Sequence, residues 1–186
     1  MISRRLTFSL LPALLVIAAL GAPSVASSST RCANADLVPT ATNLKQVSRA
    51  TVCLVNVERK LRQRKALRTS EQLERAARTF SVKMVSEGFF AHVSPGGSTL
   101  TTRVQGGTSY LRGARTWALA ENLGWGTGEL STPRHTVRAW MESPGHRVNI
   151  LSPRYGHIGV GVTAGTPTSL DGRSAATYTA DFGSRK

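Results

Sequence analysis

The chain has 186 residues, of which 40% are hydrophobic and 18% are charged. This composition excludes a fibrous protein or a disordered tail and indicates one globular domain. Lysine and arginine together number 24 against 10 aspartates and glutamates, which gives a formal net charge of +14. An excess of this size favours anionic partners.

The first 26 residues have the pattern of a secretory signal peptide. Arg4 and Arg5 give a positive start, residues 10–20 are almost wholly apolar, and Ser24 and Ala26 are small residues at the −3 and −1 positions of a cleavage site. The apolar run is too short for a bilayer, which needs about 20 residues, and no later segment is apolar enough to span one. We therefore expect residues 1–26 to be cleaved, leaving a secreted, extracellular protein with no transmembrane segment. Removal of Arg4 and Arg5 lowers the net charge to +12.

The two cysteines, Cys32 and Cys53, both lie after the predicted cleavage point. An exported protein meets an oxidising environment, so the sequence predicts a Cys32–Cys53 disulfide. Two free thiols are the alternative, and a metal site made of these residues alone is poorly supported because structural zinc takes four ligands. The bridge would tether residues 27–48, an N-terminal leader, to the domain formed by residues 49–186.

Helical signals dominate residues 52–143. Apolar residues at helical spacing predict a first helix from Val52, and a T-x-x-Q capping box at residues 69–72 predicts a second that ends at Gly88. Ser98 is expected to cap a short helix through Val104. Thr132, followed by a proline, predicts a helix that ends before residue 144.

The period of the apolar residues then changes from helical to alternating. Residues 157–163 and 178–182 alternate as strands do, and the Asp171–Gly172 pair between them signals a hairpin turn. The glycine-rich residues 124–128 are expected to form a turn or loop. Helices followed by an antiparallel sheet predict an α+β fold.

Three residues are candidates for chemistry. His92 and His146 stand in segments that read as loops, and Glu121 is an acidic residue inside an apolar run, where a lone carboxylate is costly to bury. If they converge, the three could hold a divalent metal with an open position or position a water for general-base attack. The alternative is that the histidines are ordinary surface groups.

Several motif classes are excluded. There is no G-x-S-x-G, H-E-x-x-H or Walker sequence, and the G-x-G-x-x-A pattern at residues 159–164 is not followed by a helix. Six basic residues lie within residues 59–68. Export argues against a nucleic-acid partner, so the run reads as the solvated end of a helix or as a surface for anionic envelope polymers.

Seven short segments carry a family resemblance; they are residues 54–59, 89–97, 103–104, 120–123, 140–151, 157–162 and 181–183. In this order they resemble the bacterial branch of the CAP superfamily, named for cysteine-rich secretory proteins, antigen 5 and pathogenesis-related proteins, and also called SCP-like. The resemblance implies a three-layer α-β-α sandwich with a central antiparallel sheet and a cleft. Residues 49–186 would form this CAP-like domain.

Members of this superfamily often carry two histidines and two glutamates in the cleft. His92, Glu121 and His146 match three of these positions, and the two histidines match those that bind a divalent cation such as zinc in some members. The second glutamate falls at Ser143; Glu142 is one position short and would point elsewhere on a helix.

The missing nucleophile motifs and the incomplete set of two histidines and two glutamates favour a secreted, non-enzymatic binding module whose cleft can take a divalent cation. Its ligand could be a lipid or a polysaccharide. One alternative is a protease or cell-wall hydrolase that uses Glu121 or a histidine as general base. Another is an electrostatic binder of anionic envelope polymers, which high salt would release.

Overall fold

The computed structural model describes residues 32–168 and 174–186. The predicted signal peptide and the Asp171–Gly172 turn therefore lie outside the described residues. The elements follow in the order α1 (Leu44–Leu61), β1 (Arg68–Thr69), α2 (Glu71–Glu87), α3 (Leu100–Gly107), β2 (Trp117–Thr127), the 3₁₀ helix η2 (Gly128–Ser131), α4 (Pro133–Glu142), α5 (Pro144–Leu151), β3 (His157–Ala164) and β4 (Ala175–Arg185).

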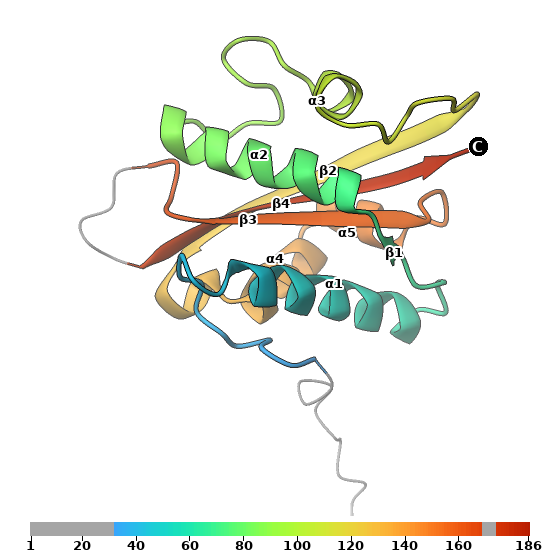
Figure 1. Cartoon of the computed structure of the whole chain (residues 1–186). Coiled ribbons are helices and arrows are strands. Elements are labelled where there is room, and N and C mark those ends of the chain that lie inside the picture. The colour runs from blue at the N-terminus through green and yellow to red at the C-terminus, as the bar shows by residue number, and fades with distance from the viewer. Residues whose placement is uncertain (1–31, 169–173) are drawn as a thin grey trace, which may run out of the picture.

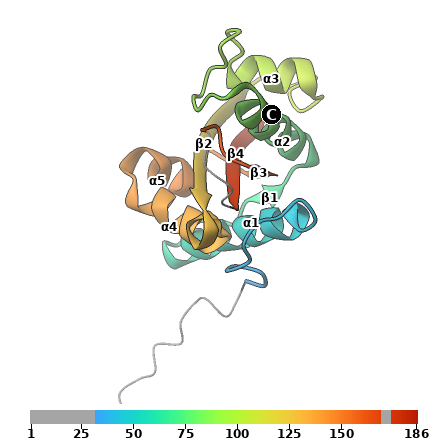
Figure 2. The ribbon, with the colours of Figure 1, turned by 90° about the vertical axis from the view of Figure 1, so that its left-hand side faces the viewer.

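The architecture is the expected α+β sandwich, with one sheet between two helical layers. The four strands are ordered β1-β3-β4-β2; β4 pairs antiparallel with both β3 and β2, and the two-residue β1 adds to β3 in parallel. Helices α2 and α3 cover one face, while α1, α4 and α5 cover the other (Figures 1 and 2). Strand β2 is thus an edge strand of the sheet.

Alternation along β3 and β4 builds the two halves of the core. Ile158 and Val160 of β3, with Tyr178 and Phe182 of β4, pack in a large cluster with apolar residues of α1, α4 and α5. Residues between them face α2. A Cβ on Gly161 would lie 2.0 Å from the backbone nitrogen of Arg78 in α2, so the absence of a side chain lets this helix lie directly on the sheet.

The helix ends follow the sequence signals closely but not everywhere. Helix α2 ends at Gly88, whose φ of 66° is left-handed, as predicted. Its N-cap is Ser70, one residue after the predicted Thr69, because the Ser70 hydroxyl accepts the Leu73 amide. The short helix is likewise capped one residue late, by Thr99, while Thr132 caps α4 as predicted.

Some element assignments made from the sequence are wrong. Helix α1 begins at Leu44 rather than Val52, so it takes in the end of the predicted leader. The glycine-rich residues 124–128 form no loop, since residues 124–127 belong to β2. A Cβ on Gly126 would lie 2.3 Å from the Leu130 carbonyl oxygen. Gly124 and Gly126 therefore allow close contact with neighbouring segments, whereas Gly128, with a φ of 53°, begins η2.

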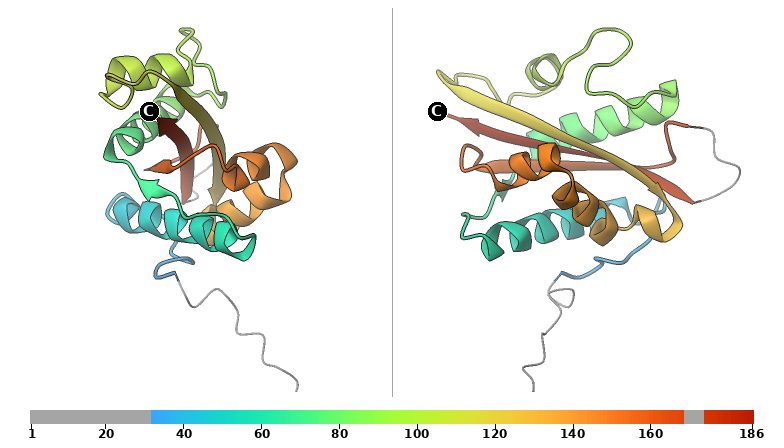
Figure 3. Two further views of the ribbon diagram at one scale, coloured as in Figure 1. Left: turned by 90° about the vertical axis from the view of Figure 1, so that its right-hand side faces the viewer. Right: turned by 180° about the vertical axis from the view of Figure 1, so that it is seen from behind.

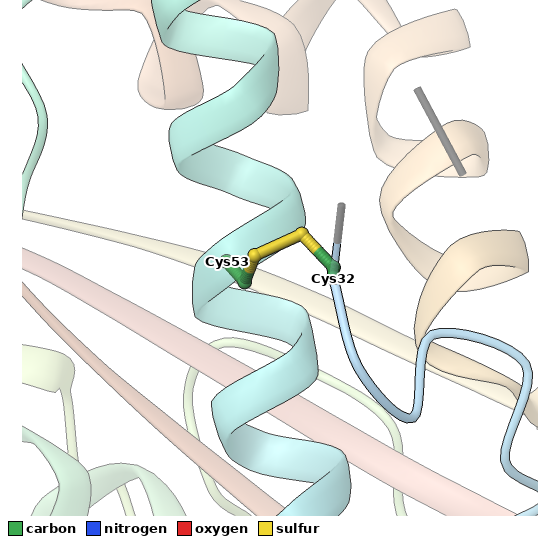
Figure 4. Close-up of a disulfide and its surroundings, with 2 residues drawn as sticks. All are labelled: Cys32 and Cys53. Atoms are coloured by element: carbon green, nitrogen blue, oxygen red, sulfur yellow. A yellow bond between two sulfur atoms is a disulfide. The ribbon is translucent and has the colours of Figure 1, made fainter. Parts of the chain in front are cut away.

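The predicted disulfide is present. Cys32 and Cys53 are bonded, with their Cα atoms 5.8 Å apart, and the bridge joins the start of the described chain to the middle of α1 (Figure 4). Closing a loop of this length stabilises the folded state by about 3 kcal/mol in the chain-entropy model.

Candidate functional site

The candidate site begins with one carboxylate held between two cationic side chains. Glu121, in the middle of β2, points toward the α2 and α3 layer and is buried. Its Oε1 lies 2.8 Å from Nδ1 of His92, and Arg103 of α3 donates from Nη2 to its Oε2 at 2.5 Å. Both oxygens of the carboxylate are therefore engaged by protein donors.

Arg103 fixes the loop that carries His92. Its Nη1 donates to the carbonyl oxygens of His92 and Ser98, each at 3.0 Å, and its guanidinium carbon lies 3.4 Å from the centroid of the Phe80 ring. Because one side chain bonds the loop, the strand and an α2 aromatic ring together, His92 is positioned relative to Glu121 by a rigid contact.

The local electrostatics favour a protonated His92. The hydrogen bond to Glu121 raises the pKa of this histidine, while partial burial and the charge of Arg103 oppose the rise. The side chain of His92 is 59% exposed, whereas that of Glu121 is 3% exposed. The imidazole is therefore largely exposed to solvent, while its Nδ1 is hydrogen-bonded to the buried Glu121.

A second, fully buried carboxyl lies beside Glu121. Asp181 of β4 is directly paired with Glu121 across the sheet, and neither of its oxygens has a hydrogen-bond partner among the described residues. Burial, and next the negative charge of Glu121, raise the pKa of Asp181 well above its ordinary value. The arrangement favours a neutral Asp181 beside Glu121.

His146 reaches the site from the opposite helical layer. It lies in the first turn of α5, not in a loop as predicted, and Asn122 of β2 donates to its carbonyl oxygen at 3.0 Å. Burial, with a contribution from the charge of His92, lowers the pKa of His146. The two imidazoles therefore interact electrostatically across the edge strand β2. Figure 3 shows α5 beside that strand.

The sequence-predicted trio is therefore only partly in contact. His92 and Glu121 are hydrogen-bonded, and His146 lies near enough to His92 for their charges to interact. Only His92 comes from a loop. Glu142 points away, as expected, since it pairs with Arg138 at 2.9 Å on the exposed side of α4. His157, outside the trio, instead bonds the Tyr110 hydroxyl at 3.0 Å.

The donor set fits a metal incompletely. In residues 32–168 and 174–186, no group of three or more His, Cys, Asp or Glu side chains is arranged to hold a metal ion. His92 and His146 would supply two imidazoles, and Glu121 would orient the first of them. Zinc sites normally use three or four protein ligands, so we derive no chemical step through a metal here.

A groove of about 620 Å³ lies along the edge of β2 and has His146 among its lining residues; we call it the β2-edge groove. Its apolar walls come from the loop after α2, from β2, η2 and α4, and include Phe90, Leu123, Trp125, Leu130 and Trp140. Phe90 is 44%, Trp125 40% and Leu130 55% exposed. Large apolar side chains gathered at one exposed groove are typical of a binding site.

The lining of the groove also contains polar residues. His135, Thr136, Ser143 and His146 line it together with the apolar residues. Two backbone carbonyls of β2 are meanwhile already satisfied: Trp140 Nε1 donates to that of Leu123 at 2.8 Å, and Asn149 donates to that of Glu121 at 3.3 Å. Because these acceptors on the edge are taken, the groove is better suited to a small molecule than to an added β-strand.

Sequence reasoning did not assign several residues that build the site. The helical spacing around Arg103 says nothing of its bond to a strand 18 positions further along the chain. Asp181 carried a usable signal, because a charged residue within an alternating strand between two helical layers has to be buried. The groove residues Phe90, Trp125 and Leu130 carried none, since each reads as an ordinary loop or strand residue.

Comparisons with known proteins agree with the fold. The model of the cysteine-rich secretory protein family, CAP, matches residues 52–179. The uncharacterized protein YkwD of Bacillus subtilis (strain 168) is 39% identical over 109 residues, which cover 58% of this chain and 39% of YkwD. The chain therefore spans well under half the length of that relative.

Two solved structures have the same fold. An extracellular protein containing an SCP domain from Bacillus anthracis str. Ames superposes with a TM-score of 0.59 at 26% identity, over 77% of this chain and 43% of that one. An outer surface protein from Borrelia burgdorferi also gives 0.59, at 20% identity, over 80% and 97% of the two chains. With a family match that covers more than half of its residues, the chain belongs to the CAP family of cysteine-rich secretory proteins.

Proposed function

We propose that this protein is an extracellular binding module that holds a small amphipathic molecule, of the fatty-acid type, in the β2-edge groove. The main support is the groove itself, a cavity of about 620 Å³ whose walls expose Phe90, Trp125 and Leu130 to solvent. Covering such side chains with an apolar chain removes their surface from water.

The polar residues that line the groove support an amphipathic ligand over a purely apolar one. Ser143 can donate a hydrogen bond through its hydroxyl and His146 through its ring, and His92, whose pKa is raised by Glu121, lies near His146. A carboxylate head group placed beside these residues would find donors and positive charge, while its tail would lie against Trp125 and Leu130.

The state of Glu121 supports binding over hydrolysis. A general base needs a carboxylate free to take a proton from water, but both oxygens of Glu121 are hydrogen-bonded, one to His92 and the other to Arg103. Hydrolysis of casein or peptidoglycan by the purified protein, abolished in both His92→Ala and Glu121→Ala, would contradict a purely binding role.

Extracellular location is part of the proposal. The signal-peptide pattern supports it, as do the solved relatives described as an extracellular protein and an outer surface protein. Among the described residues, no helix is both long and apolar enough to cross a bilayer. Detection of the protein in culture medium or on the cell surface, with its N-terminus at Ser27, would agree with the proposal.

A divalent cation at His92 and His146 is a further part of the proposal. Glu121 orients His92 in the way that carboxylates orient metal-bound histidines, which supports it. Titration of the metal-free protein with zinc in a calorimeter should give heat that His146→Ala removes. Absence of heat from the unmodified protein would eliminate the cation and leave the apolar groove untouched.

Two tryptophans of β2 allow a matched test of the groove. Trp125 lines it, whereas Trp117, at the other end of the strand and similarly exposed at 43%, does not. We expect dodecanoate to bind, measured by calorimetry, and Trp125→Ala to weaken binding about tenfold, because apolar contact with a large side chain is lost. Trp117→Ala should leave the affinity nearly unchanged. Equal losses in the two variants, or no binding of dodecanoate, would contradict the proposal.

A further inference from the structure

A second cavity, of about 600 Å³, lies at the end of the sheet where α1 stops; we call it the basic pocket. Its charged lining residues are all cationic: Arg59, Arg64, Lys65, Arg68 and Arg154. They come from the end of α1 and the segment after it, from β1, and from the segment after α5. Figure 1 shows the end of α1 beside β1.

The floor of the basic pocket is a buried guanidinium with no anionic partner. Arg59 is 1% exposed, and it donates to the carbonyl oxygens of Lys65 at 2.8 Å, Ile150 at 2.6 Å and Ser152 at 3.0 Å. No carboxylate of the described chain pairs with it, and burial lowers its pKa. Since Arg59 occupies these three carbonyls, the pocket is left with donors and positive charge.

The rim of the basic pocket carries cationic side chains that are exposed to solvent. Arg64, Lys65 and Arg154 are exposed, and within residues 32–168 and 174–186 their side chains make no hydrogen bond or ion pair. Positive charge at the end of α1 would by itself complement the helix dipole. That explanation does not reach Arg154, which lies about ninety positions further along the chain and still converges on the same cavity.

Basic character extends beyond the pocket along the sheet end. Nη2 of Arg68 lies 3.3 Å from Nε2 of His157, and a smaller neighbouring cavity is lined by His157 and Arg185, with Glu71 as its one acidic residue in the part of the chain that the structure describes. A ligand with repeated negative charges could therefore contact both cavities at once.

We propose that the basic pocket binds the phosphate groups of a phosphodiester polymer that lacks aromatic bases. Guanidinium groups donate in pairs to phosphate oxygens, and a tetrahedral phosphate accepts from several directions, as side chains from three segments require. The site is separate from the β2-edge groove, so this proposal does not rest on the proposed function.

Nucleic acid fits the basic pocket less well. Single-stranded nucleic acids are held by aromatic side chains on which bases stack. Of the nearby aromatic residues, Tyr155 packs against Phe182, with ring centroids 6.0 Å apart, and Tyr110 is 3% exposed. Tyr110 has no exposed face and Tyr155, which lines the pocket, is only partly exposed, so the pocket offers at most one ring for base stacking and suits a charged backbone without bases.

Two triple variants of equal net charge test the proposal. Arg64→Gln, Lys65→Gln and Arg154→Gln together remove the pocket rim, while Arg75→Gln, Arg78→Gln and Arg112→Gln together remove three exposed charges outside it. The probe is a fluorescent poly(glycerol phosphate) oligomer, with binding followed by anisotropy near physiological salt. Thermal unfolding of both variants establishes that they are folded.

We expect the rim variant to bind about tenfold more weakly and the control variant to change less than about twofold, because only the first removes direct contacts. Equal weakening in both would show that net charge alone acts and would overturn the site. So would absence of binding, binding of polyglutamate of the same charge as tightly as poly(glycerol phosphate), or tighter binding of a single-stranded DNA oligomer of the same length.

Discussion

His92 and His146 lie on opposite sides of one edge strand and are tuned in opposite directions. The bond to Glu121 raises the pKa of His92, whereas burial lowers the pKa of His146. The pair therefore combines one imidazole whose pKa lies above the ordinary histidine value with one whose pKa lies below it. At a given pH, His92 therefore favours its cationic form more strongly than His146 does.

The His92–Glu121 contact makes stability depend on pH. A raised folded-state pKa means that this contact stabilises the fold fully below the ordinary histidine pKa of 6.5, and that the contribution is lost as the pH rises through the folded value. In buffer with a chelator, His92→Gln should lower the melting temperature more at pH 6 than at pH 9. A difference from the unmodified protein that stays constant between these pH values would contradict the assignment.

The neutral form of Asp181 should also be detectable from the pH dependence of the melting temperature. Because its pKa is raised from 3.8, the folded protein holds this proton more tightly than the unfolded chain, and stability falls as the pH rises above that value. Asp181→Asn removes this dependence. We expect the variant to gain in melting temperature relative to the unmodified protein between pH 4 and pH 7. A relative loss over that interval would show that Asp181 is a stabilising anion.

At the scale of elements, local sequence signals predicted those helices and strands whose ends depend on neighbouring residues. The cap, the apolar period and the terminal glycine of α2 all act within one helix, so they identified it to within a residue. The alternation of β3 and β4 was equally informative. The prediction of a loop at residues 124–127 is wrong because the glycines there are required by tertiary packing: Leu130 and Trp140 lie too close to the strand for a side chain.

The contact between α2 and β3 offers a test of this interpretation. A Cβ on Gly161 would lie 2.0 Å from the backbone nitrogen of Arg78, and helix backbone cannot yield as a flexible side chain does. Gly161→Ala should therefore lower the unfolding free energy by about 3 kcal/mol, measured with urea. Gly156→Ala is the control, since a Cβ there meets nothing within 4 Å. Equal effects at the two positions would contradict the close packing.

At the scale of the whole molecule, two surfaces with different chemistry lie at different parts of one sheet. The β2-edge groove has apolar walls and some polar lining residues, and the basic pocket at the end of α1 is cationic. The sequence anticipated the histidines and the basic run by residue type. It could not place Phe90, Trp125 and Leu130 together, because they meet only after β2, η2 and the loop after α2 have packed.

The most direct test of the central claim is where a ligand binds. Dodecanoate titrated into the isotope-labelled protein should shift the backbone amide resonances of Leu123, Trp125, Leu130 and Ser143 in proportion to occupancy, while those of Trp117 and Arg154 stay in place. Shifts confined to the sheet end near Arg154, or no shifts at saturating dodecanoate, would contradict binding in the β2-edge groove.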